Sequence, residues 1–287
     1  MKTINGNDFL EMLSSGANNL TNQHHEINAL NVFPVPDGDT GTNMNLTFTS
    51  GLNDSRKVMT SDIGQLSKTL SRGLLMGARG NSGVILSQIF RGFAQSVEKF
   101  SEVNVSQLAD AFQMGKEIAY KAVMRPVEGT ILTVVRESSQ DAYDYVLKNK
   151  DISVLEFFEY LVERANVSLE NTPELLPVLK EVGVVDSGGK GYVVILEGFI
   201  AALKGESIEL VELDESAAIS AADLEHDEFG YCTEFIIRLD EDAPSNYDEN
   251  VFRSQLEAIG NSLVVVTDED LVKVHVHTLK PGNALNL

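Results

Sequence analysis

The sequence predicts a mainly α protein in which a large helical domain is followed by a smaller α+β domain. From Asn7 to Gly205 the apolar residues recur mostly at helical spacing. After residue 228, three short segments rich in β-branched residues replace that pattern. A chain of 287 residues has room for two domains, since single cores stop growing near about 250–300 residues. We therefore expect a helical domain over 1–205, an acidic linker over 206–228 and an α+β domain over 229–287.

Residues that favour helix starts precede the apolar segments of the first domain. Short polar side chains can accept hydrogen bonds from the unpaired N–H groups of a first helical turn. The predicted starts, in chain order, are Asn7 or Asp8, Ser61 or Asp62, Asn81 or Ser82, Ser106, Thr130, Ser153 and Thr172-Pro173.

In the last sixty or so residues the spacing of apolar residues changes from a helical to a strand pattern. Segments 234–238, 262–266 and 272–277 have strand character, and a helix over 250–259 separates the first two. The chain stops at Leu287, soon after Pro281-Gly282, before so small a domain would be complete. We expect a fragment of a longer protein.

Charge and composition exclude several classes of function. Lys and Arg number 22 against 43 Asp and Glu, which gives a net charge of −21 and a field that repels nucleic acid and anionic lipid. No apolar run approaches the roughly 20 residues of a membrane span. The opening Met1–Asp8 lacks the features of a secretory signal, and there is one cysteine, so we expect a cytoplasmic protein.

The segment Asn31–Met44, NVFPVPDGDTGTNM, carries the strongest chemical signal. Asp37 and Asp39 lie two residues apart and can converge on one hard cation such as Mg²⁺, whose remaining ligands would be water and phosphate oxygens. Thr40, Thr42 and Asn43 would follow at the start of a helix, where phosphate is favoured. An ordinary surface turn is the alternative, because Asp-Gly-Asp is common turn chemistry.

Three further glycine-rich or turn segments also precede predicted helices: Gly77–Gly83, Arg125–Thr130 and Val185–Gly191. Glycine lets the backbone approach a ligand, but it equally suits a close-packed helical hairpin. Val185–Gly191 departs from a P-loop, because Val184 and Gly191 stand where glycine and Ser or Thr are required. Several helix starts facing one ligand would explain all four segments.

Four segments, 31–44, 77–88, 126–132 and 184–191, together resemble the ATP-binding subunits of bacterial fatty acid kinases. The first domain of that family is similar to the nucleotide-binding subunit of dihydroxyacetone kinase. The resemblance implies an antiparallel eight-helix barrel that holds ATP and two Mg²⁺ ions at one end. Asp37 and Asp39 match two of the family's three metal-binding aspartates, and Asn31 stands near the third. The nucleotide contacts that the resemblance implies are Thr40, Thr42, Asn43, Met44, Asn81, Ser82, Gly83, Thr130, Asp186, Ser187 and Gly188.

The resemblance also implies the reaction. The terminal phosphate of ATP would pass to the carboxylate of a fatty acid held by a separate fatty-acid-binding protein, giving an acyl phosphate. An ionised carboxylate needs no general base, so catalysis would be positioning and charge neutralisation, with Arg79 and Lys190 as candidate cations. Both side chains also suit an ordinary solvated surface. The alternatives are a non-enzymatic nucleotide-binding regulator and a dihydroxyacetone-type sugar kinase subunit.

Cys232, His275 and His277 form a second candidate site. Side chains two apart on a strand share a face, so both imidazoles could join the cysteine around Zn²⁺ if their strands pair. A buried cysteine beside a polar strand face is the ordinary interpretation. The resemblance to the middle domain of fatty acid kinase favours the metal site, and it also suggests a homodimer.

Overall fold

The computed structural model describes residues 1–211, 230–240 and 247–287. The chain divides into a helical unit, 1–120 with 126–221, and a small unit, 121–125 with 222–287. Most of the expected linker, 206–228, lies outside the described residues. Among the described residues, no helix combines the length and apolar character needed to cross a bilayer.

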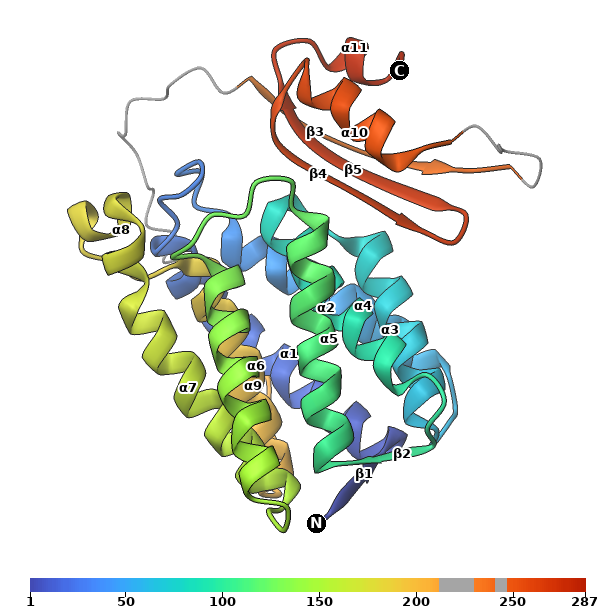
Figure 1. The fold of residues 1–287 in the computed structure, drawn as a ribbon, viewed down its shortest axis with the longest axis vertical. Coiled ribbons are helices and arrows are strands. Elements are labelled where there is room, and N and C mark those ends of the chain that lie inside the picture. The colour runs from blue at the N-terminus through green and yellow to red at the C-terminus, as the bar shows by residue number, and fades with distance from the viewer. Residues whose placement is uncertain (212–229, 241–246) are drawn as a thin grey trace. The chain divides into compact units, whose positions relative to one another are not determined.

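The helical unit is a bundle of long helices joined by short connections (Figure 1). A short antiparallel ribbon of β1 (Thr3–Asn5) and β2 (Glu102–Asn104), which the sequence did not predict, accompanies it. The helices are α1 (Gly6–Ala29), α2 (Thr40–Lys57), α3 (Ile63–Gly77), α4 (Gly80–Val97), α5 (Val105–Ala122), α6 (Ile131–Lys148), α7 (Val154–Leu175), the short α8 (Pro177–Val182) and α9 (Ser187–Leu203).

The long helices close into a ring. Each of α1, α2 and α3 packs against the helix that follows it, α6 packs against α7, and α9 packs against both α7 and α1. Between α4 and α5, a Cβ atom added to Gly92 would lie 2.6 Å from the Cα atom of Gly115, so the two backbones nearly touch. Gln113 of α5 donates a hydrogen bond to the carbonyl of Ser139 in α6. The predicted helical barrel is confirmed.

Phenylalanine side chains fill the interior of the ring. They stack or meet edge to face, with ring centroids from 5.1 Å for Phe9–Phe93 to 6.5 Å for Phe90–Phe199. Such contacts add to the free energy gained by burying the rings. The cluster joins six helices through Phe9, Phe48, Phe90, Phe93, Phe112, Phe157, Phe158 and Phe199.

Three predicted helix caps are confirmed. Asp62 accepts a hydrogen bond from the Gln65 N–H, Thr130 caps α6, and Ser153 forms a reciprocal capping box with Glu156. Each side chain satisfies an N–H group that has no partner within its own helix.

Other predicted starts were misplaced. Asn5, not Asn7 or Asp8, caps α1, because its side chain accepts from both of those N–H groups. Arg79 is the N-cap of α4, which leaves the predicted caps Asn81 and Ser82 inside its first turn. Two further starts differ by a few residues.

Helix α5 begins at Val105 rather than at Ser106, since Asn104 and Gln107 exchange side-chain hydrogen bonds with each other's backbone N–H groups. The prediction that a short helix starts at Thr172-Pro173 was wrong. Pro173 lies inside α7, near its end, and α8 starts with Pro177, whose missing N–H has no cost at a first helical position.

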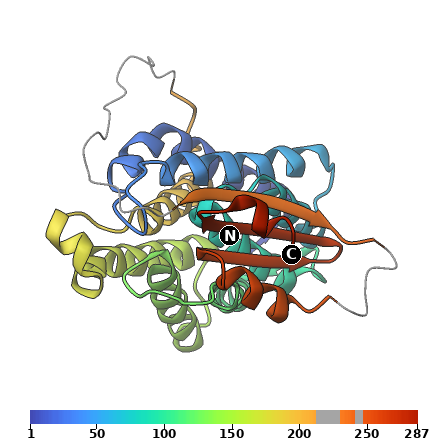
Figure 2. The same ribbon diagram turned by 90° about the horizontal axis from the view of Figure 1, so that it is seen from above.

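The small unit is α+β, as predicted. Strands β3 (Tyr231–Arg238), β4 (Asn261–Asp268) and β5 (Leu271–Thr278) form an antiparallel sheet in the order β3-β5-β4, seen from above in Figure 2. Helix α10 (Glu249–Glu257) precedes β4, and α11 (Pro281–Ala284) follows β5. Val272, Val274 and Val276 of β5 belong to the core of this unit. Because side chains alternate, His275 and His277 lie on the opposite face of the sheet.

Candidate active site

Four connections meet at one end of the helical unit. In a ring of consecutive antiparallel helices, alternate connections share an end, so those before α2, α4, α6 and α9 lie together. Direct contacts agree with this, since Arg79 N–H, in the α3–α4 turn, donates to the Thr47 hydroxyl of α2 at 3.1 Å. The four segments that the sequence singled out are therefore at the same end of the bundle.

Asn31 closes the acidic loop between α1 and α2. Its side-chain amide donates to the Val35 carbonyl at 2.8 Å, and its amide oxygen accepts from the Thr40 N–H at 3.2 Å and the Thr40 hydroxyl at 2.5 Å. Asn31 is only 6% exposed. The structure thus gives this side chain a loop-closing role, and its service as a magnesium ligand stays a prediction.

Asn28, which the sequence did not single out, holds the next part of the loop. Its amide oxygen accepts from the Thr42 N–H at 3.0 Å, and its NH₂ group donates to the Thr42 hydroxyl at 2.9 Å. A Cβ atom on Gly41 would lie 2.2 Å from the His24 carbonyl oxygen, so only glycine fits this approach of α2 to α1. Asn28 on α1 and Asn31, just after the end of α1, therefore fix the start of α2.

Asp37 and Asp39 lie at the tip of this loop, close to each other. Asp37 is exposed as a residue, and its carboxyl group is partly desolvated. That desolvation, and then the negative charge of Asp39, raise the pKa of Asp37 to about 7. Two carboxyl groups this close present a concentrated negative charge to a cation once both are ionised. The pair suits a divalent metal such as Mg²⁺.

The starts of α2 and α4 touch. Gly80 has a positive φ of 58°, and a Cβ atom there would lie 2.5 Å from the side-chain nitrogen of Asn43. A Cβ atom on Gly83 would lie 2.3 Å from the Thr47 hydroxyl. Asn81 and Ser82 therefore begin α4 directly beside Asn43, and the side-chain oxygen of Asn81 is buried without a hydrogen-bond partner among the described residues.

Asp186 joins the starts of α6 and α9. Its carboxylate accepts from the Gly189 N–H at 2.7 Å and also from the backbone N–H groups of Gly188 and Ile131. Burial nonetheless raises the pKa of Asp186 to about 6. Thr130 caps α6 with a 3.4 Å hydrogen bond from the Leu132 N–H. Asp186 thus stabilises the ends of two helices at the site, in addition to the nucleotide contact predicted for it.

The remaining predicted residues differ in exposure. Arg79 is exposed at the N-cap of α4, and Lys190 is half-buried in the first turn of α9, so both side chains have access to solvent near the site. Ser187 is buried. Met44 is fully buried, and a Cβ atom on Gly191 would lie 2.6 Å from its sulfur. The structure therefore gives Met44 a packing role under α9.

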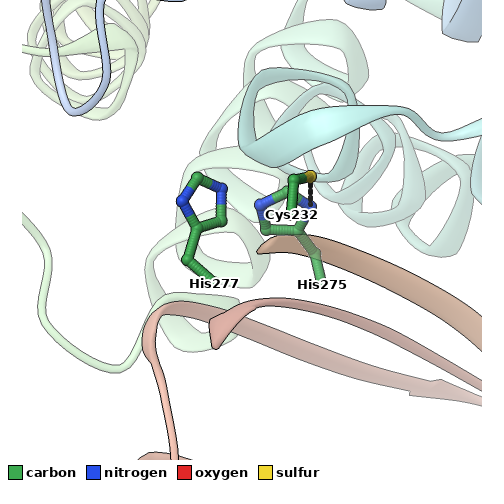
Figure 3. A group of neighbouring side chains, drawn as sticks. All are labelled: Cys232, His275 and His277. Atoms are coloured by element: carbon green, nitrogen blue, oxygen red, sulfur yellow. Dashed lines mark hydrogen bonds between the residues drawn. The ribbon is translucent and has the colours of Figure 1, made fainter. Parts of the chain in front are cut away.

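The small unit brings Cys232, His275 and His277 together, as Figure 3 shows. Strand β3 runs antiparallel to β5 with Cys232 opposite His277 and Glu234 opposite His275. One possible ligand atom from each of the three residues lies within 4.8 Å of the other two. A thiolate and two imidazoles form a zinc donor set, with a fourth position for another ligand, so the residues present fit such an ion.

Comparison with known families identifies the family of the helical unit. The DAK2 domain model matches residues 34–201, more than half of the chain. The chain belongs to the DAK2 domain family. All four connections at the site fall within this DAK2 domain, apart from the first residues of the acidic loop. A second model, for the middle domain of fatty acid kinase-like proteins, matches residues 228–287.

Bacterial relatives align with both units. An uncharacterized protein of Staphylococcus aureus (strain USA300) is 51% identical over 296 residues, covering 99% of this chain and 53% of the relative. Protein YloV of Bacillus subtilis (strain 168) is 51% identical over 297 residues, covering 100% of this chain and 53% of the relative. The chain thus spans about half the length of these relatives. A solved dihydroxyacetone kinase of C. freundii matches 69% of this chain and 34% of its own with a TM-score of 0.47 and 17% identity.

Proposed function

We propose that the helical unit binds ATP with two Mg²⁺ ions and transfers the terminal phosphate to the carboxylate of a fatty acid. The observation that carries the proposal is the Asp37–Asp39 pair, held beside the adjoining starts of α2 and α4. Membership of the DAK2 domain family supports nucleotide binding and kinase chemistry. The match of residues 228–287 to a fatty acid kinase middle domain supports the fatty acid as the acceptor.

Asp37 and Asp39 would hold the metal ions, which neutralise the charge of the phosphates when bound. Thr42, Asn43, Asn81 and Ser82 would bind phosphate oxygens through their side-chain hydroxyl and amide groups, and Asn81 and Ser82 also through their backbone N–H groups, since all four lie at helix starts with positive partial charge. The backbone N–H groups of Thr42 and Asn43 already donate to Asn28 and Asp39. Asn28 fixes Thr42 before the ligand arrives, and such preorganised donors stabilise charge without rearrangement.

The acceptor would be delivered by a separate fatty-acid-binding protein. A fatty acid carboxylate is ionised at neutral pH, so the site needs cations to bring two anions together rather than a base to activate the acceptor. Arg79 and Lys190 would supply positive charge near the transferred phosphate. The protein would act as a homodimer.

A dihydroxyacetone-type sugar kinase is the second candidate, favoured by the family alone. A sugar hydroxyl would require a general base, so the acceptor can be decided by its chemistry. A nucleotide-binding regulator would retain nucleotide without turnover when either acceptor is supplied.

Zinc binding by Cys232, His275 and His277 is a separate part of the proposal, and its support is the donor set described above. Such an ion would cross-link β3 to β5, a structural role for which a closed coordination shell is typical. The zinc site and the nucleotide site can be tested independently.

The nucleotide site is tested by calorimetric titration of ATP with and without Mg²⁺. Asp37→Asn and Asp39→Asn should each weaken magnesium-dependent binding at least about tenfold, because one of few metal carboxylates is lost. Asp54→Asn is the matched control, since Asp54 lies on α2 but pairs with Lys57 at the surface. Unchanged binding in both loop variants would remove the metal assignment. Acyl phosphate formation is then measured with the fatty-acid-loaded binding protein, and dihydroxyacetone serves as the competing acceptor.

A further inference from the structure

A fourth polar side chain, Glu234, completes the array formed by Cys232, His275 and His277. Cys232 and Glu234 are two residues apart on β3, and His275 and His277 are two apart on β5, so each pair lies on one face of its strand. The register sets Cys232 opposite His277 and Glu234 opposite His275. Residues directly opposite on paired strands bring their side chains together. The four side chains thus occupy a two-by-two block on one face of the sheet.

Glu234 is bound to a particular nitrogen of His275. Its Oε1 atom lies 2.8 Å from Nδ1 of the imidazole, and its Oε2 atom lies 3.9 Å from the ammonium of Lys273, which is only 4% exposed. The same Nδ1 also lies 4.0 Å from the Cys232 sulfur, so the nitrogen that faces Glu234 is engaged within the block. Nε2, the other ring nitrogen, is then the one available to an ion.

Nε2 of His275 is the atom left for a ligand. The residue is 2% exposed, and Nε2 is buried without a hydrogen-bond partner among the described residues. A buried acceptor without a partner is costly, and a bound metal would give it one. Figure 3 shows the imidazoles of His275 and His277 side by side, with ring centroids 5.2 Å apart.

We propose that Glu234 is a positioning residue for a divalent metal ion: it holds the Nδ1–H of His275 so that Nε2 is presented to the ion together with Cys232 and His277. Histidine ligands of metals commonly donate their other N–H to a carboxylate, which fixes the ring and makes the ligating nitrogen more basic. The inference rests on the zinc part of the proposed function and is independent of the ATP site.

The test titrates Co²⁺ into the full chain, with Zn²⁺ affinity then measured by competition against a chelator. Cobalt bound to a thiolate gives a charge-transfer absorption that reports Cys232 directly. Glu234→Ala removes the acceptor, whereas Glu234→Gln keeps a side-chain oxygen that can accept from Nδ1–H. Glu257→Gln is the matched control, because it removes one carboxylate from α10 of the same unit. Circular dichroism of each metal-free variant shows whether it folds.

The proposal expects Glu234→Ala to bind Zn²⁺ about 10–100-fold more weakly, as is typical when such an outer carboxylate is lost. Glu234→Gln should recover most of that affinity, and both variants should keep the thiolate absorption at saturation. Equal Zn²⁺ affinity in the unchanged protein and in a folded Glu234→Ala variant would overturn the proposal. The proposal would also be overturned if Glu234→Gln bound Zn²⁺ as weakly as Cys232→Ser, because Glu234 would then be a metal ligand itself. No thiolate absorption in the unchanged protein would overturn the zinc site and this inference together, while leaving the ATP titration to decide the kinase proposal.

Discussion

Asn31→Ala should loosen the loop that carries Asp37 and Asp39. The substitution removes three hydrogen bonds at once: one to the Val35 carbonyl and two from Thr40. Alanine also leaves a small void, because Asn31 is only 6% exposed. The effect should therefore appear both in the stability of the helical unit and in the geometry of the candidate metal loop.

The expected cost follows from the partners that are left behind. Val35 is half-buried, so water can reach its carbonyl, and the Thr40 hydroxyl can rotate to another acceptor. The Thr40 N–H cannot move, and Thr40 is 7% exposed. A buried group without a partner costs roughly 1–3 kcal/mol, and each replaced hydrogen bond about 0.5–1.5 kcal/mol. We expect the free energy of unfolding to fall by roughly 2–4 kcal/mol.

Urea unfolding followed by far-ultraviolet circular dichroism measures this loss, since the helical unit dominates that signal. Asn149→Ala is the control: Asn149 is an exposed asparagine whose side chain donates to the Tyr145 carbonyl, and its loss should cost under about 1 kcal/mol. A loss for Asn31→Ala no larger than for the control would show that the loop does not depend on Asn31. The loop-closing role described above would then be wrong.

Three other predictions follow from the same unit. The pKa of Asp37 beside Asp39 is about 7 in the metal-free loop, so protons compete with Mg²⁺ for this carboxylate. Magnesium titrations should therefore show the Mg²⁺ affinity falling below about pH 7, toward a tenfold loss per pH unit. Burial raises the pKa of Asp186 from 3.8 to about 6, so between these pH values the native state binds more protons than the unfolded state. The stability that this group contributes is therefore lost as the pH rises from about 4 to about 6. In urea unfolding, the Asp186→Asn variant should lack this pH dependence, which in the unchanged protein changes the free energy of unfolding by roughly 3 kcal/mol. On α9, a Cβ atom on Gly198 would lie 2.5 Å from a Cα atom of α1, whereas one on Gly191 would lie 2.6 Å from a methionine sulfur. A methionine side chain can move aside but the backbone of α1 cannot. Gly198→Ala should therefore lower the thermal unfolding temperature more than Gly191→Ala.

Local signals account for the parts of the fold that the sequence predicted. Asp62, Thr130 and Ser153 cap helices through contacts within a few residues, so their sequence neighbourhoods suffice to predict them. The alternation of residues 272–277 likewise predicts a strand with both histidines on one face. The acidic loop was recognisable because two carboxylates, two glycines and a helix start lie within one short segment.

Other features depend on contacts that no local pattern carries. Asn28 matters because α2 lies against α1, and its partner Thr42 is 14 residues away. Strand β1 pairs with β2 about a hundred residues later in the chain, with only three residues in each strand. Pro173 stays inside α7 although proline usually ends a helix, and the Thr172 beside it binds the Asp186 N–H. Such positions are decided by tertiary packing, which overrides local propensity.

The four helix starts at the candidate site differ in how far the protein already satisfies them. Asp186 accepts from the starts of both α6 and α9, and Asn28 of α1 and Asn31 just after it accept from N–H groups of α2. Arg79, the N-cap of α4, makes no side-chain capping hydrogen bond. Because the first N–H groups of a helix carry a positive partial charge and need acceptors, an anionic ligand gains most where no side chain has taken that place. The proposed phosphate contacts Asn81 and Ser82 lie in the first turn of α4, and the proposed metal ligands Asp37 and Asp39 lie in the acidic loop. Such a division would explain how a chain with a net charge of −21 could bind a polyphosphate.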